Sequence, residues 1–447
     1  MVLSLFDLFQ IGIGPSSSHI NGPMNAAYEF ASRLFFRELM FRTSRIEVRF
    51  FGPIAWSGPL HHTDRAILLG LSGEQPEFIN VTTIGGILAL IRERRQLSLR
   101  GLHSIPFHES RDVVYCKEPI QGTCSNRLNF RASNAEGQTL TEATYFITSG
   151  GSVFREDERT APSTPRKLPH PFRTAMELLE TAEKRHRAIW ELVLENEMAS
   201  HTEEEILNHV NRLWKTMQQS MARGLETEGL LPGGRGVKRS APACARRLQN
   251  TLRRDPLHGA MDWLDVWATA VSEENAAGGR IVAAPTCGAS GVFPAVANYY
   301  LKFMHGNQEG LGRFFLAATA IGSVCLQKDQ PLGCQAAIGV ASAMAAAGLA
   351  SATGGTNEQI TRAAELALDE YLGMTCDAVG PVQNPCIERN ARGARRAVHS
   401  VLMAVLVRSD KIALDRAIRT AGKGAAEMQS RYKVRSPGLL PVGVVEC

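Results

Sequence analysis

The run Gly14–His19 (GPSSSH) carries groups that suit the binding of a small anion. It opens a predicted helix, and a helix N-terminus preceded by small hydroxyl residues offers backbone N–H groups and the positive end of the helix dipole. A carboxylate or a phosphate would bind well there. An ordinary serine N-cap followed by a turn explains the same residues, so the sequence leaves both interpretations open.

A second run, His61–Arg65 (HHTDR), also precedes a predicted helix. In one interpretation Thr63 or Asp64 is the N-cap and the two histidines lie at the surface. In the other, an imidazole oriented by a carboxylate acts as a base or as a substrate-binding group. The loop Pro285–Gly291 (PTCGASG) is similarly open, because its small residues suit either an anion or two closely packed backbones.

Three cysteines, Cys334, Cys376 and Cys386, each lie at a junction between a predicted helix and a loop. Their spacings match no zinc finger and no compact ferredoxin run. A buried free thiol is the ordinary explanation for any one of them. Three at helix junctions, together with Cys447 as the last residue of a non-helical segment, weaken that explanation without removing it.

The elements that must position these residues fall into two differently patterned regions. Residues 1–155 mix strand and helix signals, residues 156–172 have the proline-rich, charged composition of a linker, and residues 173–430 are almost entirely helical in pattern. In the first region we predict a strand over Arg45–Ile54, a hairpin over Leu128–Ala132 and Leu140–Ile147, and helices over Asn25–Phe41 and Thr63–Leu71. In the second we predict helices over Thr174–Glu197, Thr202–Arg223, Ala260–Val271, Val292–Met304, Gly310–Val324, Cys334–Ala350, Asn357–Leu372, Cys386–Val407 and Leu414–Ser430.

Composition narrows the class of protein. The 447 residues are 44% hydrophobic and 21% charged, which indicates a globular chain of two or three domains. A net charge of +5 without a dense basic tract argues against nucleic-acid binding. Nine cysteines are too few for a disulfide scaffold, and no signal peptide is apparent, so a cytoplasmic location is expected. The uncharged stretch Gln330–Asn357 is built from Ala, Gly and Ser, which favours a buried helix over a membrane span.

Taken together, these motifs resemble the bacterial iron–sulfur-dependent L-serine dehydratase (L-serine ammonia-lyase) in its single-chain form. The likeness covers nearly the whole chain. The matching segments, in order, are Ser4–Asp7, Ile11–His19, His61 with Thr63–Ala66, Pro285-Thr286 with Gly288-Ala289, Gly333–Gln335, Thr375–Asp377, Pro385–Ala391 and Val445–Cys447.

The resemblance implies an α+β fold. Residues 1–155 would form an α/β domain of the serine dehydratase β type, which binds substrate or regulates, and 156–172 the linker. Residues 173–430 would form an all-helical iron–sulfur catalytic domain, and residues 431–447 a tail that reaches the active site. A homodimer that acts on L-serine, without nucleic acid or membrane as partner, is expected. The implied role is in amino acid catabolism and gluconeogenesis.

The resemblance also implies a [4Fe–4S] cluster whose protein ligands match Cys334, Cys376 and Cys386, with Cys447 able to occupy the fourth iron when substrate is absent. An iron with an open position can act as a Lewis acid on the β-hydroxyl of serine. No pyridoxal phosphate is needed. Elimination followed by hydrolysis then yields pyruvate and ammonia.

The matching positions suggest roles for the polar runs. We expect Ser16, Ser17, Ser18 and His19 to hold the substrate carboxylate, and His61 to be the base, because it matches the histidine of the family's His-Gly-Thr-Asp. Asp64 is a possible orienting residue. His62 stands at the glycine of that motif and is the alternative base.

Several positions depart from the family pattern. No glutamate stands near Cys334, the segment between Cys376 and Cys386 is one residue shorter, and Cys287 replaces an asparagine. Arg435–Leu439 lacks the usual threonine and paired glycines. Lost carboxylates would alter the charge and pKa values around a cluster. A catalytically weak serine-binding paralogue, and a lyase of the same mechanism for another small hydroxy amino acid, therefore stand as alternatives.

Overall fold

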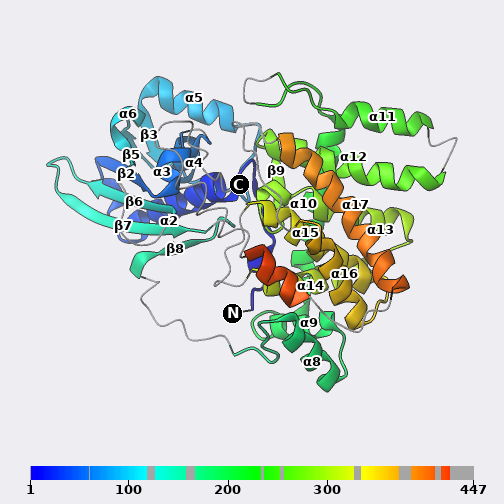
Figure 1. Cartoon of the computed structure of the whole chain (residues 1–447). Helices are drawn as coiled ribbons and strands as arrows, with labels where there is room; N and C mark the ends of the chain where they lie inside the picture. Colours follow the sequence, from blue (N-terminus) through cyan, green and yellow to red (C-terminus); the bar gives the residue numbers. More distant parts are fainter. Residues whose placement is uncertain are drawn as a thin grey trace. The chain divides into compact units, whose positions relative to one another are not determined.

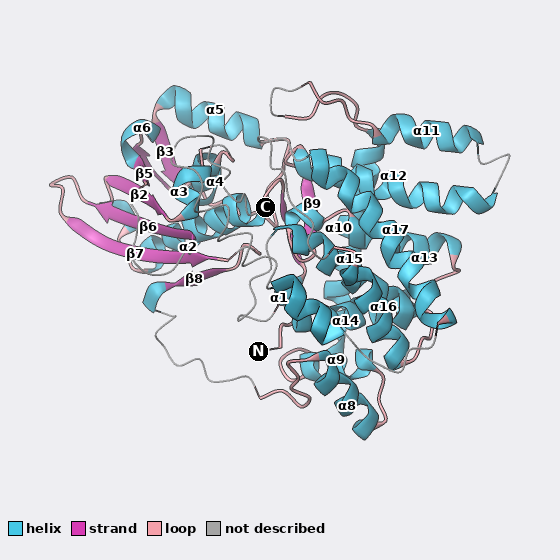
Figure 2. Cartoon of the chain, in the orientation of Figure 1, coloured by secondary structure: helices cyan, strands magenta, loops and turns pink. Residues whose placement is uncertain are grey.

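The computed structural model describes residues 2–59, 61–117, 126–148, 150–157, 167–232, 236–251, 256–326, 334–371, 384–407 and 414–422. These residues form two compact units (Figure 1). The sheet unit contains the described residues from 12 to 157 together with 278–280. The helical unit contains residues 2–11, the described residues from 167 to 277, and those from 281 to 422. Strands gather in the first and helices dominate the second, which confirms the predicted α+β class (Figure 2).

The sheet unit is built on a five-stranded mixed sheet with the order β5-β2-β6-β7-β8. Strands β2 and β5 are parallel, and the other neighbours are antiparallel. The bounds are β2 Arg45–Phe51, β5 Val113–Cys116, β6 Asn126–Ser133, β7 Thr139–Ile147 and β8 Val153–Arg155. The predicted hairpin is confirmed as β6–β7. The period-two pattern of β2 is confirmed because Ile46, Val48 and Phe50 are fully buried.

Helices pack on this sheet and carry the first two polar runs. Their bounds are α2 Gly22–Phe36, α3 Pro53–Ser57, α4 Thr63–Leu71, α5 Ile84–Arg94 and α6 Glu109–Asp112, with short turns η1 Ser17–Asn21 and η2 Met40–Arg42 and a second sheet of β3 Gln96–Leu99 and β4 His103–Pro106. The predicted helix Thr63–Leu71 is confirmed as α4. Helix α2 ends five residues before the predicted Phe41, because Glu38 takes a positive φ of 58° that a helix does not allow.

The helical unit consists of packed helices with the bounds α1 Leu5–Leu8, α8 Ala175–Arg185, α9 Ile189–Met198, α10 Glu203–Glu226, α11 Ala241–Thr251, α12 Pro256–Ala276, α13 Val292–Phe303, α14 Gln308–Cys325, α15 Cys334–Ala352, α16 Asn357–Asp369 and α17 Asn384–Leu406. Residues 414–422 are also helical, η3 spans Cys287–Ala289, and β1 (Gln10–Ile13) pairs with β9 (Arg280–Ala283). The single helix predicted over Thr174–Glu197 is wrong. His186 adopts a left-handed φ of 53° and ends α8, and α9 starts afresh.

Helix α15 lies in the core of this unit. Residues Ala343–Ala347 are fully buried, and α15 packs against α13, α14, α16 and α17. Small side chains permit this close packing: a Cβ on Gly348 would come within 2.7 Å of the Phe314 carbonyl oxygen. The described part of the uncharged stretch thus contains a buried helix, α15, as predicted, while residues 330–333 lie outside the described residues. Among the described helices, none combines the length and the hydropathy needed to cross a membrane.

The first residues of the chain pack in the helical unit, although the sheet unit follows them in sequence. The buried carboxylate of Glu197 accepts the Ser4 hydroxyl at 2.7 Å and the Leu5 backbone N–H at 2.8 Å. The Leu3 backbone N–H donates to the Ser323 hydroxyl at 2.8 Å. One carboxylate on α9 thus caps and holds α1.

Candidate active site

Ser16 to His19 form a buried turn at the entry to α2. Ser16 has an extended backbone, with φ −138°, and its hydroxyl accepts the His19 backbone N–H at 3.4 Å. The residues that follow form a π-helical turn, η1, which continues directly into α2. None of the four side chains is more than 1% exposed. Ser16 is thus the serine N-cap that the sequence offered as one of two interpretations.

The His19 ring is held from both sides by hydroxyl groups. Its Nε2 lies 2.7 Å from the Ser57 hydroxyl, and its Nδ1 lies 3.0 Å from the Ser18 hydroxyl and 3.2 Å from that of Ser16. Ser57 already donates its hydrogen to the Pro53 carbonyl, at 2.9 Å. The Ser57 oxygen must therefore accept from Nε2, so neutral His19 carries its hydrogen on Nε2 and accepts on Nδ1.

His61 lies against His19. The two ring centroids are 4.5 Å apart, with the planes inclined by 39°. The His61 backbone N–H lies 3.2 Å from the carbonyl oxygens of Ser57 and Gly58. Ser57 therefore contacts both histidines, one through its side chain and one through its backbone. The sequence had not singled out Ser57, although it stands four residues before His61.

Burial controls the protonation of His61. The side chain is largely buried, and this desolvation, with a smaller effect from the charge of His62, lowers the pKa of His61 from 6.5 to about 4. His61 is therefore neutral at pH 7 and has a lone pair available to accept a proton.

His62 is exposed to solvent, whereas Asp64 contacts a charged side chain. His62 is exposed and has a left-handed backbone, with φ 56°, which is the conformation that favours glycine. This geometry gives a physical reason for the glycine of the family motif at that position. Asp64 lies 3.2 Å from Arg92, whose guanidinium also makes a two-pronged contact with Glu109.

Asp64 belongs to a carboxylate pair that shares one guanidinium. Burial and then hydrogen bonding with Glu109 raise the pKa of Asp64, while the Arg92 hydrogen bond lowers the pKa of Glu109. Between the described side chains of His61 and Asp64 we find no hydrogen bond. Through Arg92 the pair joins the first turn of α4, which follows His62, to α5 and α6, and the orienting role of Asp64 stays a prediction.

In the helical unit, the loop Pro285–Gly291 is fixed to the first turn of α17 by one side chain. Asn390, 1% exposed, accepts the Gly291 backbone N–H at 3.0 Å. Its amide group donates to the carbonyl oxygens of Gly288, at 2.8 Å, and Cys386, at 2.7 Å. Close packing of two backbone segments, one of the interpretations of this loop, is therefore present.

Helices α15 and α17 run in the same direction. The Ser342 hydroxyl of α15 donates to the Gly393 carbonyl of α17 at 2.8 Å. Eight residues further along both helices, Ala350 and Val401 line one hollow. Contacts that advance together along both chains define parallel helices, so the starts of α15 and α17 lie at the same end of the pair.

This arrangement places two of the predicted cluster ligands at one level. Cys334 is the first residue of α15, eight residues before Ser342, and Cys386 stands seven residues before Gly393. At 1.5 Å per residue, both cysteines lie about 11–12 Å from the Ser342–Gly393 contact. Cys386 is buried. Cys376 and Cys447 lie outside the described residues, as does the side chain of Cys334.

Comparison with protein families covers both units. The model described as "Serine dehydratase beta chain" matches residues 4–158, and the one described as "Serine dehydratase alpha chain" matches residues 184–441. The chain belongs to the serine dehydratase family. The second match is the unit that contains Cys334 and Cys386, and the first contains Ser16–His19 and His61.

Full-length relatives support the same assignment. The chain is 41% identical to an L-serine dehydratase of Streptomyces coelicolor over 459 aligned positions, which cover 100% of both chains. It is 37% identical to L-serine dehydratase 2 of Escherichia coli over 456 positions, and 39% identical to an L-serine dehydratase of Mycobacterium tuberculosis over 467, again with 100% coverage of both chains.

Of the cysteines that the serine dehydratase resemblance implies as cluster ligands, Cys386 has a described side chain and Cys334 a described backbone, and a thiol is the donor such a cluster needs. Cys386 lies in the first turn of α17 and is buried. Cys334 begins the parallel helix α15, and thiolates are the ligands of such clusters. The described residues alone contain no group of three His, Cys, Asp or Glu side chains arranged for a metal, and Cys376 and Cys447 fall outside them.

Two departures from the family pattern fall on buried residues. Ala337 and Ile338, the small and apolar residues found where the family has a glutamate nearby, are buried in the core of the helical unit. Cys287, at the asparagine position of the loop, is also fully buried and lies in η3.

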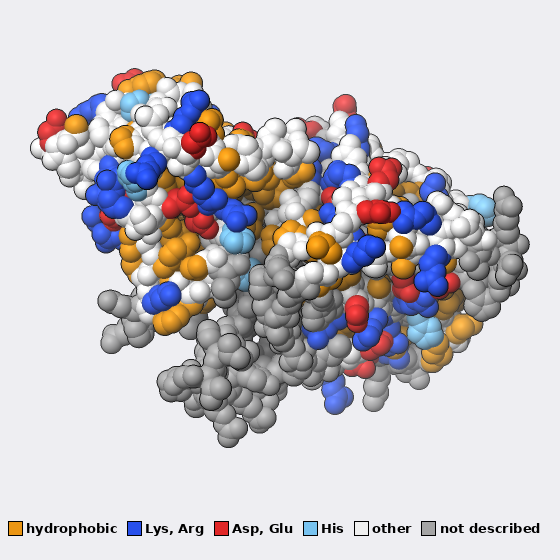
Figure 3. Space-filling view, turned by 90° about the horizontal axis from the view of Figure 1, so that it is seen from above, with side chains coloured by type: hydrophobic (Ala, Val, Ile, Leu, Met, Phe, Trp, Pro, Cys, Tyr) orange, Lys and Arg blue, Asp and Glu red, His pale blue; other side chains and the backbone are white. Residues whose placement is uncertain are grey.

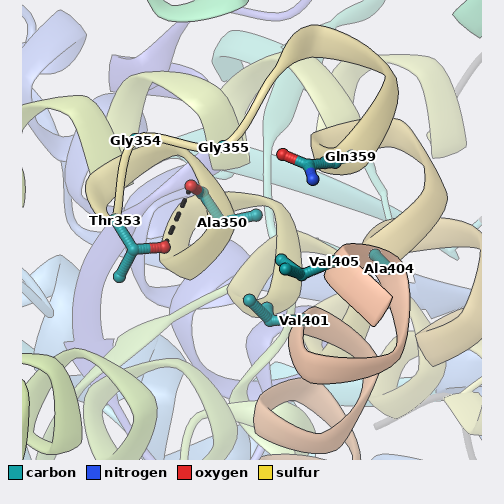
Figure 4. A pocket seen from close by; sticks show the side chains of 8 residues that line it. All are labelled: Ala350, Thr353, Gly354, Gly355, Gln359, Val401, Ala404 and Val405. Atoms are coloured by element: carbon teal, nitrogen blue, oxygen red, sulfur yellow. Dashed lines mark hydrogen bonds between the residues drawn. The ribbon is translucent and has the colours of Figure 1, made fainter. Parts of the chain in front are cut away.

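A hollow of about 220 Å³ lies at the far end of the parallel helix pair, away from the cysteines (Figure 4). Ala350, Val401 and Val405 supply apolar walls. The Thr353 hydroxyl is bonded to the Ala350 carbonyl at 3.1 Å, and the Gln359 amide oxygen accepts the Thr356 N–H at 2.9 Å. Its polar side chains already have partners and none is titratable, so the hollow is a packing gap with no chemistry to offer.

The sequence analysis did not identify the residues that hold the candidate site residues in place through hydrogen bonds. Ser57, Arg92, Glu109 and Asn390 each act on a residue remote in sequence or in the next turn. Asn390 lies inside Pro385–Ala391, a segment that matches the family, and this match was the only indication of its importance in the sequence. The others are ordinary surface-type residues whose partners are set by the fold.

Proposed function

We propose that this chain is an L-serine dehydratase that converts L-serine to pyruvate and ammonia with a [4Fe–4S] cluster held by Cys334, Cys376 and Cys386. The observation that carries the proposal is the full-length likeness to enzymes named L-serine dehydratase. That likeness does not favour a weak serine-binding paralogue or a lyase for another hydroxy amino acid.

The geometry of the helical unit supports the cluster. Cys334 begins α15 and Cys386 lies in the first turn of the parallel helix α17, at the same end of the pair. We assign Cys376 as the third ligand and Cys447 as the residue that would occupy the remaining iron without substrate. When bound, the cluster supplies an open iron that acts as a Lewis acid on the β-hydroxyl. Buried Cys386 is kept from solvent and from oxidation in bulk water.

The serine–histidine turn supports carboxylate binding. Nδ1 of His19 has one lone pair but two neighbouring hydroxyls, those of Ser16 and Ser18, so it accepts fully from only one. Because the Ser18 hydroxyl is the nearer of the two, the Ser16 hydroxyl can turn its hydrogen to a bound carboxylate. We assign Ser16–His19 to holding the carboxylate, which fixes the α-carbon relative to the base.

His61 is the residue we assign as the base that removes the α-proton. At pH 7 it is neutral, because burial lowers the pKa to about 4. A bound carboxylate close to the ring would raise the pKa of His61, since an opposite charge stabilises the imidazolium. Substrate binding would therefore make His61 a stronger base when it is needed. Exposed His62 is the less suitable candidate.

The proposed reaction takes place in a cytoplasmic enzyme of amino acid catabolism and gluconeogenesis, assembled as a homodimer. On the face shown in Figure 3, Lys and Arg side chains are interspersed with Asp and Glu, as the near balance of 49 basic and 44 acidic residues suggests. The described residues on that face offer no continuous basic surface to nucleic acid.

Anaerobic reconstitution followed by a serine-to-pyruvate assay tests the proposal. The expected product is a brown protein with about four irons per chain that releases pyruvate from L-serine. Treatment with hydroxylamine, which traps pyridoxal phosphate, should leave turnover unchanged. Colourless, iron-free protein after reconstitution would contradict the proposal of a cluster. Brown protein that releases no pyruvate from L-serine would contradict the proposed substrate.

A further inference from the structure

The structure assigns Asn390 as a positioning residue. Its side chain holds the backbone of the cluster ligand Cys386 at a fixed position relative to the loop Pro285–Gly291. The inference rests on the proposed function, because it gives Cys386 its meaning as a ligand. It goes beyond that function in naming a residue that touches neither substrate nor iron and yet fixes their surroundings.

The amide group of Asn390 has hydrogen-bond partners for both of its N–H hydrogens and for its oxygen. Both of its amide hydrogens are donated, to the Gly288 and Cys386 carbonyls, and its oxygen accepts from Gly291 N–H. Asn390 is 1% exposed, so water cannot replace these bonds. Aspartate would place a carboxylate against two carbonyl oxygens, and glutamine is one carbon too long. The position requires an asparagine on physical grounds.

The loop is tightly confined where Asn390 holds it. A Cβ on Gly291 would clash with the Ser272 hydroxyl and the Ala268 carbonyl of α12, and would lie 3.1 Å from the Asn390 Cβ. The loop is therefore fixed between α12 on one side and the first turn of α17 on the other. Any shift of Cys386 along α17 must be transmitted to the loop through Asn390.

The loop carries two polar groups that the described part of the fold leaves without partners. The hydroxyls of Thr286 and Ser290 are buried, at 8% and 1% exposure, and neither has a hydrogen-bond partner among the residues that the structure describes. Buried polar groups without partners are rare in folded proteins. Their place beside the turn of Cys386 suits a loop that meets a group bound by that cysteine, and Asn390 sets the distance between the two.

The test compares Asn390→Ala with Ser342→Ala in the reconstituted full-length enzyme. Ser342 is the matched control, because its hydroxyl also makes a buried bond to α17, with Gly393, but has no link to the loop or to Cys386. For Asn390→Ala we expect iron release to a chelator to accelerate about tenfold and KM for L-serine to rise about tenfold, which equals about 1.4 kcal/mol for each. For Ser342→Ala both should stay within about twofold of wild type.

A second variant reaches the same link from the other side. Gly291→Ala displaces the loop while keeping the Asn390 side chain and its bond to the Cys386 carbonyl, so it should raise KM and change the response of the cluster's spectrum to L-serine while iron content stays at the wild-type level. It also serves if Asn390→Ala fails to fold.

The outcomes separate the inference from the proposed function. Wild-type protein without iron or pyruvate release contradicts both. Suppose instead that the wild-type enzyme is active, and that Asn390→Ala and Gly291→Ala have the same chelator resistance and the same KM as Ser342→Ala. That result overturns the inference and leaves the proposed function standing. Equal thermal destabilisation of all three variants with unequal KM supports positioning over general stability.

Discussion

The two units build their polar sites in opposite ways. In the sheet unit, Ser16, Ser18 and His19 are neighbours in sequence, and only Ser57 and His61 come from elsewhere. In the helical unit, Cys334 and Cys386 are brought to one end by the parallel packing of two helices. A contiguous turn is specified by local capping and hydrogen bonds, whereas the cysteine pair depends on the whole core. Damage to the first should therefore act on chemistry alone, and damage to the second on cofactor content as well.

The largest effect should follow a change on the helical side. We expect Cys386→Ser to lose cluster iron and to reduce pyruvate formation by about a thousandfold or more, because Lewis-acid activation supplies several kcal/mol of the barrier reduction. Iron analysis and the pyruvate assay measure both. Cys244→Ser, on α11 and outside the proposed ligand set, is the control and should keep its iron. Full iron in Cys386→Ser would break the comparison.

On the sheet side, His61→Asn should separate chemistry from cofactor. We expect kcat to fall about 10²–10⁴-fold with iron content unchanged, because general-base catalysis contributes about that much. His62→Asn, which changes an exposed neighbour, should retain activity within about threefold. A larger loss in His62→Asn than in His61→Asn would transfer the role of base to His62.

Ser57→Ala should have an intermediate effect. It removes the oxygen that receives the His19 Nε2 hydrogen, which costs about 1 kcal/mol and raises KM for L-serine roughly fivefold. Ser72→Ala is matched to it, because Ser72 makes the same bond to a carbonyl four residues earlier but has no histidine partner. Steady-state kinetics on the two variants show whether the histidine contact matters.

The pH dependence of turnover should follow His61. Its pKa is lowered from 6.5 to about 4, so the free enzyme keeps its base unprotonated as pH falls and loses it only near pH 4. The acid limb of kcat/KM should therefore lie well below pH 6.5, and that of kcat, which reports the serine complex, at higher pH. Both limbs should vanish from the residual activity of His61→Asn. A limb of kcat/KM at pH 6.5 that persists in that variant would assign it to another group.

The smallest effect should come from the carboxylate pair beside α4. Arg92→Gln removes the shared guanidinium, but Arg92 is 42% exposed, so its ion pairs contribute no more than about 1 kcal/mol to folding. We expect a slight loss of thermal stability and activity within about threefold. Arg94→Gln, two residues along the same helix, is the control for a change of charge alone.

The fold class and the local polar runs could be predicted from the sequence, because periodicity and capping are local. The alternation in β2, the hairpin of β6 and β7, and helix α4 all follow patterns of a few residues. The break at His186 could not be predicted, since a left-handed residue in a charged amphipathic stretch leaves no periodic signal.

The limits at the site have the same physical cause. The serine–histidine turn was visible because its members are contiguous, but the tautomer of His19 depends on Ser57 and Pro53. The family motif pointed to Cys334 and Cys386. That both lie at the same end of α15 and α17, however, depends on the two helices running in the same direction. Asn390 has three partners in two segments that no local pattern connects.

The grip of Glu197 on Ser4 and Leu5 bears on the order in which the protein assembles. These first residues leave the ribosome early, but their partner on α9 is synthesised nearly two hundred residues later. The sheet unit can complete itself during that interval, while the opening segment has to wait for its carboxylate.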